Sequence, residues 1–130
     1  MPALRRLILA EDDPTLRHLL ATELAAAGYQ VTEARDGPEL LACLEAAART
    51  PGQGRDALAV ISDVRMPGLD GLDVLAALRC ASWSTPVILM TAFPDAATGA
   101  DARALGAACV LEKPVDVARL RRAIEALDAA

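Results

Sequence analysis

Short runs of apolar residues alternate with longer amphipathic stretches along the whole chain. The apolar runs predict five short buried strands, at residues 7–10, 31–34, 58–62, 86–90 and 108–111. Apolar residues at helical spacing follow each strand and predict five helices. The helix expected at 96–105 has the weakest pattern, because Thr98 and Gly99 lower its helix propensity.

Polar residues and glycines mark where the helices begin and end. Asp13-Pro14 predicts the start of the first helix, with Asp13 as its N-cap, and Gly28 predicts its end. Asp70 and Asp73 resemble a capping box at the start of the third helix. Residues 49–55, which contain Pro and Gly, predict the one long loop. The buried stripe of the first helix is expected to consist of Leu16, Leu19, Leu20 and Leu24.

Five strand–helix units in succession indicate a doubly wound α/β fold. Right-handed crossovers then place helices on both faces of a parallel sheet. The chain has the length of one domain, residues 1–130, and shows no repeat or interdomain linker. Sheets of this kind bind ligands beyond the carboxyl ends of their strands. We therefore expect the chemistry of the protein directly after the apolar runs.

Composition and charge exclude several classes of function. The net charge of −5 argues against binding to nucleic acid or to an anionic membrane. No apolar run approaches the roughly 18–20 residues of a membrane span. Three cysteines without a CxxC spacing are expected to be reduced thiols of a cytoplasmic protein. His18, the only histidine, is expected on the surface, so neither a His-rich metal site nor a Ser–His triad can form.

The polar residues expected at the strand ends can form one site. The first strand is followed by Glu11 and Asp12, and the third ends at Asp63. Thr91 follows the fourth strand and Lys113 the fifth. Carboxylates without His or Cys suit Mg²⁺, and a carboxylate can also act as a phosphoryl nucleophile. Because a lysine can balance phosphoryl charge and a threonine can donate to phosphoryl oxygens, this set indicates phosphoryl chemistry.

Four motifs in register, spread over the whole chain, carry a specific family resemblance. They are LILAEDDP (7–14), SDVRMPGLDG (62–71), MTA (90–92) and EKP (112–114). The chain resembles the receiver domains of two-component signalling. The sequences of its motifs are similar to those of receivers from nitrogen-fixation-type regulators. This resemblance implies a flavodoxin-like sheet with strand order 2-1-3-4-5. It also implies a phosphoacceptor switch rather than an enzyme.

The resemblance implies a role for each residue of the site. Asp63 is the phosphoacceptor, and the phosphoryl donor is a histidine kinase or a phosphotransfer protein. Thr91 and Lys113 contact phosphoryl oxygens, and the Lys113-Pro114 bond is expected to be cis. The Arg65 side chain is either solvated or paired with the carboxylates. The implied ligands of Mg²⁺ are Asp12, Asp63 and the backbone carbonyl of Arg65, with Glu11 holding the ion either directly or through a water molecule.

One departure from the family concerns how the signal leaves the domain. Many receivers carry an aromatic residue three positions before the lysine, where this chain has Val110. We therefore expect Thr91 and Phe93 to carry the coupling through their own loop. Phosphorylation is expected to remodel the face formed by residues 96–128, where a protein target or a second copy of the domain binds.

Other functions fit the residues less well. An aspartate-nucleophile phosphatase needs a second carboxylate two residues after the nucleophile, where this chain has Arg65. A flavin-binding module needs a phosphate loop rich in Ser, Thr or Gly after the first strand, where this chain has acids. The chain ends just after the last predicted helix, which favours a stand-alone receiver over a receiver cut from a larger transcription regulator.

Overall fold

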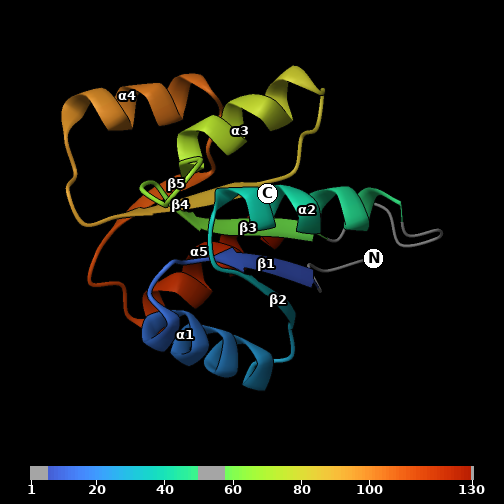
Figure 1. Ribbon diagram of the computed structural model, residues 1–130. Helices are drawn as coiled ribbons and strands as arrows, with labels where there is room; N and C mark the ends of the chain where they lie inside the picture. The colour runs from blue at the N-terminus through green and yellow to red at the C-terminus, as the bar shows by residue number, and fades with distance from the viewer. Residues whose placement is uncertain (1–5, 50–57, 130) are drawn as a thin grey trace.

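Five parallel strands form one sheet (Figure 1). The computed structural model describes residues 6–49 and 58–129, so the loop predicted at 49–55 lies almost wholly outside the described residues. The strands are β1 (Arg6–Ala10), β2 (Gln30–Ala34), β3 (Leu58–Asp63), β4 (Val87–Thr91) and β5 (Cys109–Glu112). They pair in the order β2-β1-β3-β4-β5, which confirms the predicted strand order and the doubly wound fold.

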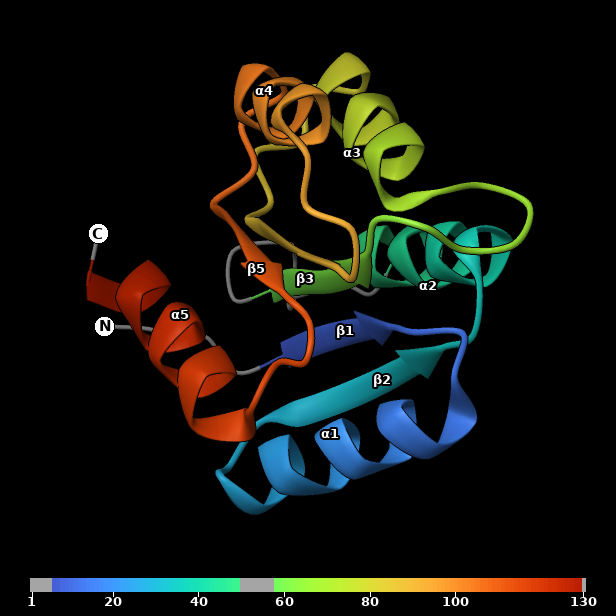
Figure 2. The ribbon, with the colours of Figure 1, turned by 90° about the vertical axis from the view of Figure 1, so that its left-hand side faces the viewer.

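One helix follows each strand, as predicted. The helices are α1 (Pro14–Ala26), α2 (Gly37–Ala48), α3 (Gly71–Cys80), α4 (Ala96–Ala104) and α5 (Val117–Ala129). Figure 2 shows α1 and α5 on one face of the sheet and α2, α3 and α4 on the other. Among the described residues, no helix has the length and apolar character needed to cross a membrane.

The sheet carries an apolar core on each face, because successive strand residues point to opposite sides. In β1, Ile8 and Ala10 belong to the core under α2, α3 and α4. Leu7 and Leu9 belong to the core under α1 and α5. The strands β3 and β4 are buried along their whole length. Two-sided burial explains why these strands are apolar runs in the sequence rather than alternating patterns.

The predicted ends of the helices are confirmed. The Asp13 carboxylate accepts hydrogen bonds from two backbone N–H groups in the first turn of α1. Asp70 and Asp73 form the capping box of α3. Gly28 follows α1 with a φ of +105°, a conformation that glycine adopts without strain. The caps of α1 and α3 fix the first turns of the helices that leave β1 and β3.

The predicted buried stripe of α1 is wrong at one position. Leu19 is 53% exposed, whereas Leu20, Ala21 and Leu24 are buried. Because residues follow one another at about 100° around a helix, Leu19 points roughly 150° away from the centre of the buried face. Ala21 takes the place that the prediction gave to Leu19. His18 is exposed, as predicted.

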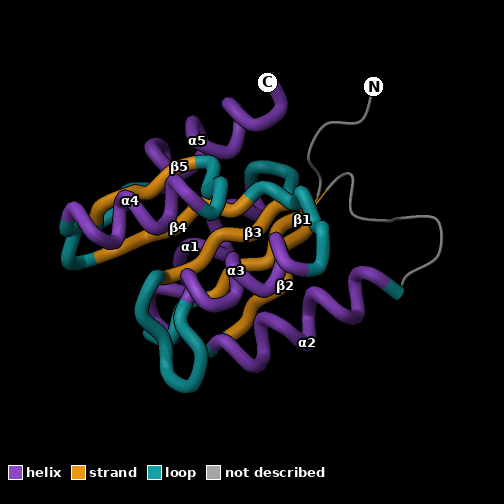
Figure 3. Tube along the Cα trace, turned by 90° about the horizontal axis from the view of Figure 1, so that it is seen from above, coloured by secondary structure: helices purple, strands orange, loops and turns teal. Residues whose placement is uncertain are grey.

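The helix α4 is held mainly at its C-terminal end. Ala102 is the one buried residue among its nine, all of which are described. The Arg79 guanidinium in α3 donates hydrogen bonds to the carbonyls of Leu105 and Gly106, at 3.0 and 3.1 Å, and to two carbonyls before β4. Figure 3 shows α4 over the side of the sheet formed by β4 and β5. At the N-terminal end of α4, close to Thr91 in the chain, the Asp95 carboxylate caps the helix by accepting from the Thr98 N–H at 2.7 Å.

Candidate functional site

The carboxyl ends of the strands bring the predicted polar residues to one edge of the sheet. Glu11 follows β1, Asp63 ends β3, Thr91 ends β4 and Lys113 follows β5. Glu11, Asp63 and Thr91 are buried, with 1%, 3% and 5% of their surface exposed, whereas Asp12 is exposed. Because β3 is the middle strand, Asp63 lies at the centre of this edge.

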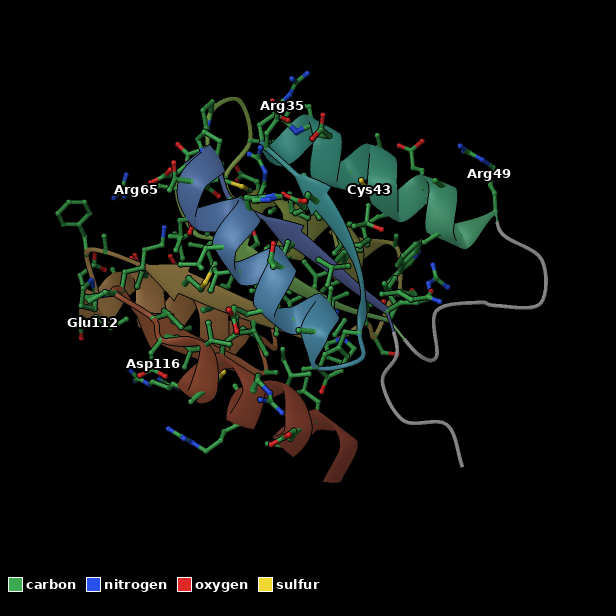
Figure 4. All side chains as sticks on the ribbon, turned by 90° about the horizontal axis from the view of Figure 1, so that it is seen from below. Arg35, Cys43, Arg49, Arg65, Glu112 and Asp116 are labelled. Carbon is green, nitrogen blue, oxygen red and sulfur yellow. The ribbon has the colours of Figure 1, made fainter. Side chains whose placement is uncertain are left out.

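A pocket of about 180 Å³ opens at this edge. Most of the predicted site residues line it, and Glu11 adjoins it through its contact with Lys113. Figure 4 shows Arg65 at the end of the molecule where Glu112 also lies, away from Arg49. The residues that line the pocket are Asp12, Asp63, Arg65, Met90, Thr91, Ala92, Phe93 and Lys113.

Lys113 connects two of the carboxylates. Its Nζ donates a hydrogen bond to Glu11 Oε1 at 2.7 Å and lies 2.6 Å from Asp63 Oδ1. The Lys113-Pro114 bond is cis, as predicted. The backbone N–H of Lys113 donates to the Thr91 carbonyl at 2.7 Å, which ties the end of β5 to the end of β4. The ammonium therefore lies beside Asp63, where the sequence placed it.

Burial and neighbouring charges shift the pKa values of this group. Burial raises the pKa of Asp63 to about 8, and Glu11 adds to the rise while Lys113 opposes it. Burial would also raise the pKa of Glu11, but its contacts with Asp63 and Lys113 bring that pKa below its ordinary value. Burial lowers the pKa of Lys113, but the two carboxylates more than offset this and leave it raised. One ammonium therefore does not balance the acids at this edge.

The acids at this edge fit a divalent cation. Oxygens of Glu11, Asp12 and Asp63 lie within 4.8 Å of one another. Asp63 Oδ2 is buried and has no hydrogen-bond partner among the described residues, an arrangement that costs free energy unless a ligand compensates it. Three carboxylates without nitrogen or sulfur ligands suit Mg²⁺. The backbone carbonyl of Arg65 stays a predicted ligand, and the Arg65 side chain is exposed.

Gly71 has a role that the sequence pattern did not indicate. A Cβ atom at this first position of α3 would overlap the backbone carbonyl oxygen of Asp63. The Gly71 N–H donates to the Val64 carbonyl at 2.7 Å, and the buried Ser62 hydroxyl donates to the Asp63 carbonyl at 2.9 Å. These contacts fix the turn after β3 and so position Asp63. The Asp70-Gly71 pair signals a helix start but not this close approach.

Replacing Gly71 with Ala is expected to destabilise the fold by about 2–3 kcal/mol, because the backbone of Asp63 must move to admit the methyl group. Urea unfolding followed by circular dichroism measures the change. Gly99→Ala is the matched control, since a Cβ atom there meets nothing within 4 Å. An alanine in α4 is expected to stabilise by up to about 1 kcal/mol. Equal effects of the two substitutions would contradict the close approach.

Comparison with known proteins identifies the family. The family model for the response regulator receiver domain matches residues 7–125. The chain belongs to this family. Receiver domains are generally phosphoacceptor switches rather than catalytic enzymes, and they act with histidine kinases and output domains.

Two relatives of this receiver are transcriptional regulators. The chain is 38% identical over 109 residues to the DNA-binding transcriptional regulator NtrC of Salmonella typhimurium, covering 84% of this chain and 22% of NtrC. It is 36% identical over 115 residues to the transcriptional regulatory protein FixJ of Bradyrhizobium diazoefficiens, covering 88% of this chain and 52% of FixJ. The chain thus spans about a fifth to a half of the length of these relatives.

Solved receiver structures share the fold over nearly the whole chain. The chemotaxis protein CheY4 of Vibrio cholerae has a TM-score of 0.81 and 28% identity, covering 95% of this chain and 98% of CheY4. A receiver domain from Clostridium thermocellum has a TM-score of 0.84 and 25% identity, covering 97% of this chain and 95% of that domain.

Proposed function

We propose that this receiver domain accepts one phosphoryl group on Asp63 from a histidine kinase or a phosphotransfer protein, in a reaction that needs Mg²⁺. The observation that carries the proposal is the buried Asp63 carboxylate at the centre of the acidic edge, with Oδ1 2.6 Å from Lys113 Nζ. A buried carboxylate that shares one ammonium with neighbouring acids is costly as packing, and such groups are typical of functional sites. Membership of the receiver family supports the same role.

The proposed transfer forms one bond and breaks one. A carboxylate oxygen of ionised Asp63 bonds to phosphorus while the P–N bond of a phosphohistidine donor breaks. The leaving imidazole nitrogen keeps the electron pair of that bond. Such a transfer depends mainly on in-line positioning of the reacting atoms and on stabilisation of charge.

The neighbours of Asp63 would hold the transferred group. Lys113 Nζ already lies beside Asp63 Oδ1 and would pair with a phosphoryl oxygen. The Thr91 hydroxyl, at the end of the adjacent strand, would donate to another phosphoryl oxygen. When bound, Mg²⁺ supplies further positive charge next to the phosphoryl group. The residues that would hold it are Glu11, Asp12, Asp63 and the backbone carbonyl of Arg65.

A phosphatase that uses Asp63 as nucleophile is less well supported. Such an enzyme needs a general acid to protonate the leaving oxygen of its substrate. The residue two positions after Asp63 is Arg65, whose side chain is exposed and carries no acidic proton at neutral pH. Among the residues that line the pocket, the acids are Asp12 and Asp63, which the proposal assigns to the metal and the acceptor.

The proposed output is a protein contact on the face formed by α4, β5 and α5, residues 96–128. Because α4 buries one residue, it can move with little loss of packing. Its N-terminal end follows Thr91 closely in the chain. The partner on this face is a protein target or a second copy of the domain, since the net charge of −5 disfavours direct contact with nucleic acid.

Intact-mass measurement after incubation with phosphoramidate and Mg²⁺ tests the proposed function. Phosphoramidate carries a P–N bond like that of phosphohistidine, so no kinase is needed. We expect the mass of one phosphoryl group to be added, and chelation of Mg²⁺ with EDTA to suppress the addition. Continuous hydrolysis of the donor without an adduct would support the phosphatase instead. Absence of both adduct and hydrolysis would contradict the proposed function.

A further inference from the structure

The side chain of Phe93 is the most exposed large apolar group that the structure describes. It is 71% exposed, at the rim of the pocket that contains Asp63. It is also the only phenylalanine in the chain. Ala92 and Pro94 flank it, and α4 begins shortly afterwards. An exposed aromatic ring leaves a large apolar surface in water, so a nearby buried position would be favourable.

A hollow of about 280 Å³ lies beside this loop, between α4 and β5. Two of the residues that face it, Gly99 and Val110, leave room because they have no side chain or a short one. Gly99 has no side chain, and a Cβ atom built there meets nothing within 4 Å. Val110 contributes only a short branched side chain from β5. The full lining is Thr91, Pro94, Asp95, Thr98, Gly99, Val110, Glu112 and Arg119, so apolar and polar residues share it.

One hydrogen bond holds the loop with the ring outside the hollow. The backbone N–H of Phe93 donates to Thr91 Oγ1 at 3.1 Å. The proposed function gives this same hydroxyl to a phosphoryl oxygen on Asp63. Turning Oγ1 toward Asp63 takes it away from the Phe93 N–H, because that N–H belongs to the segment between β4 and α4. Because a hydroxyl can accept from one group while it donates to another, the bond from the Phe93 N–H breaks only when this rotation carries Oγ1 out of its reach.

We propose that phosphorylation of Asp63 releases Phe93 from Thr91, and that the ring then enters the hollow over Gly99 and Val110. This inference rests on the proposed function. The ring exchanges a solvated position for one between α4 and β5, so its entry stabilises the phosphorylated form. It also pushes on the N-terminal end of α4, while Arg79 holds the C-terminal end. Phe93 thereby acts as a positioning residue that transmits the state of Asp63 to α4.

Fluorine NMR of the full chain tests the inference, because replacing phenylalanine with 4-fluorophenylalanine labels a single position. The change in chemical shift between H₂O and D₂O reports how much solvent reaches the ring. We expect a large solvent shift without phosphoryl donor and loss of most of it after phosphorylation with phosphoramidate and Mg²⁺. Intact mass of the same sample shows whether the adduct has formed.

Filling the hollow from another position provides the decisive comparison. Val110→Tyr places a ring in the hollow from β5, and Gly99→Leu fills it from α4 should the first variant fail to fold. In either variant the fluorinated ring is expected to stay solvated although the adduct forms. Ala77→Tyr is the matched control, because Ala77 is exposed on α3. In this control the fluorinated ring of Phe93 should become buried on phosphorylation, as in the unmodified chain.

The outcomes separate the two proposals. An adduct with a ring that stays solvated would overturn the inference and leave the proposed function intact. Burial of the ring that is unchanged by Val110→Tyr or Gly99→Leu would also overturn it, because the ring would then occupy another place. Absence of any adduct would overturn the proposed function and this inference with it.

Discussion

Replacing Asp63 with Asn is expected to abolish phosphorylation while leaving the fold intact. The amide has the shape of the carboxylate but no anionic oxygen to attack phosphorus. Because burial raises the pKa of Asp63 to about 8, a neutral side chain at this position costs the fold little. Lys113 keeps its hydrogen bond to Glu11 in the variant. Intact mass after incubation with phosphoramidate and Mg²⁺ should show no added phosphoryl group.

Asp101→Asn is the matched control for this experiment. Asp101 is an exposed carboxylate on α4, outside the pocket, so the variant is expected to gain one phosphoryl group as the unmodified chain does. Thermal unfolding should show that Asp63→Asn is as stable as the unmodified chain to within about 1 kcal/mol. A phosphoryl adduct on the Asp63→Asn variant would show that another residue is the acceptor.

The order and type of the elements could be predicted because each rests on a local signal. Buried parallel strands occur as apolar runs, and β3 and β4 are buried at every position. Aspartate at the helix starts predicts capping, which Asp13 and Asp70 confirm. The rule that ligands bind beyond the carboxyl ends of parallel strands predicts that Asp63 and Lys113 lie at one edge of the sheet, and the structure places them in contact there.

The features that could not be predicted depend on contacts between distant segments. Leu19 looks like a core residue by type, but the angle of α1 on the sheet decides that Ala21 is buried instead. The need for Gly71 arises because α3 starts against the backbone of Asp63. The hollow over Val110 depends on how α4 lies on β5, which no local pattern encodes.

The acids at the carboxyl ends of the strands, Glu11, Asp12 and Asp63, are expected to lower the stability of the fold when no ligand is bound. Asp63 Oδ2 is buried without a partner among the described residues, and Asp63 and Glu11 share a single ammonium. A core built only for stability would avoid such a group, because an unpaired buried polar atom weakens the fold. The cost is acceptable if a cation and a phosphoryl group bind together at this edge. Binding of Mg²⁺ should therefore raise the melting temperature of the protein.

Asp12→Asn is expected to weaken Mg²⁺ binding by on the order of tenfold or more, because the variant loses a charged ligand. The neighbouring substitution Asp13→Asn should weaken it by less than about fivefold, the effect of one unit charge a few ångströms away in water. The two residues have different contacts. An oxygen of Asp12 lies within 4.8 Å of those of Glu11 and Asp63, whereas the Asp13 carboxylate caps α1.

Isothermal titration with MgCl₂ measures both affinities. The two variants control for charge, because each removes one negative charge and the two positions are adjacent in the chain. Asn replaces Asp well as an N-cap, so Asp13→Asn should keep its hydrogen bonds to the backbone of Thr15 and Leu16. A general loss of negative potential would lower both affinities equally, and that result would contradict Asp12 as a ligand. A much larger loss for Asp12→Asn than for Asp13→Asn would support Asp12 as a ligand of the ion at the end of β1.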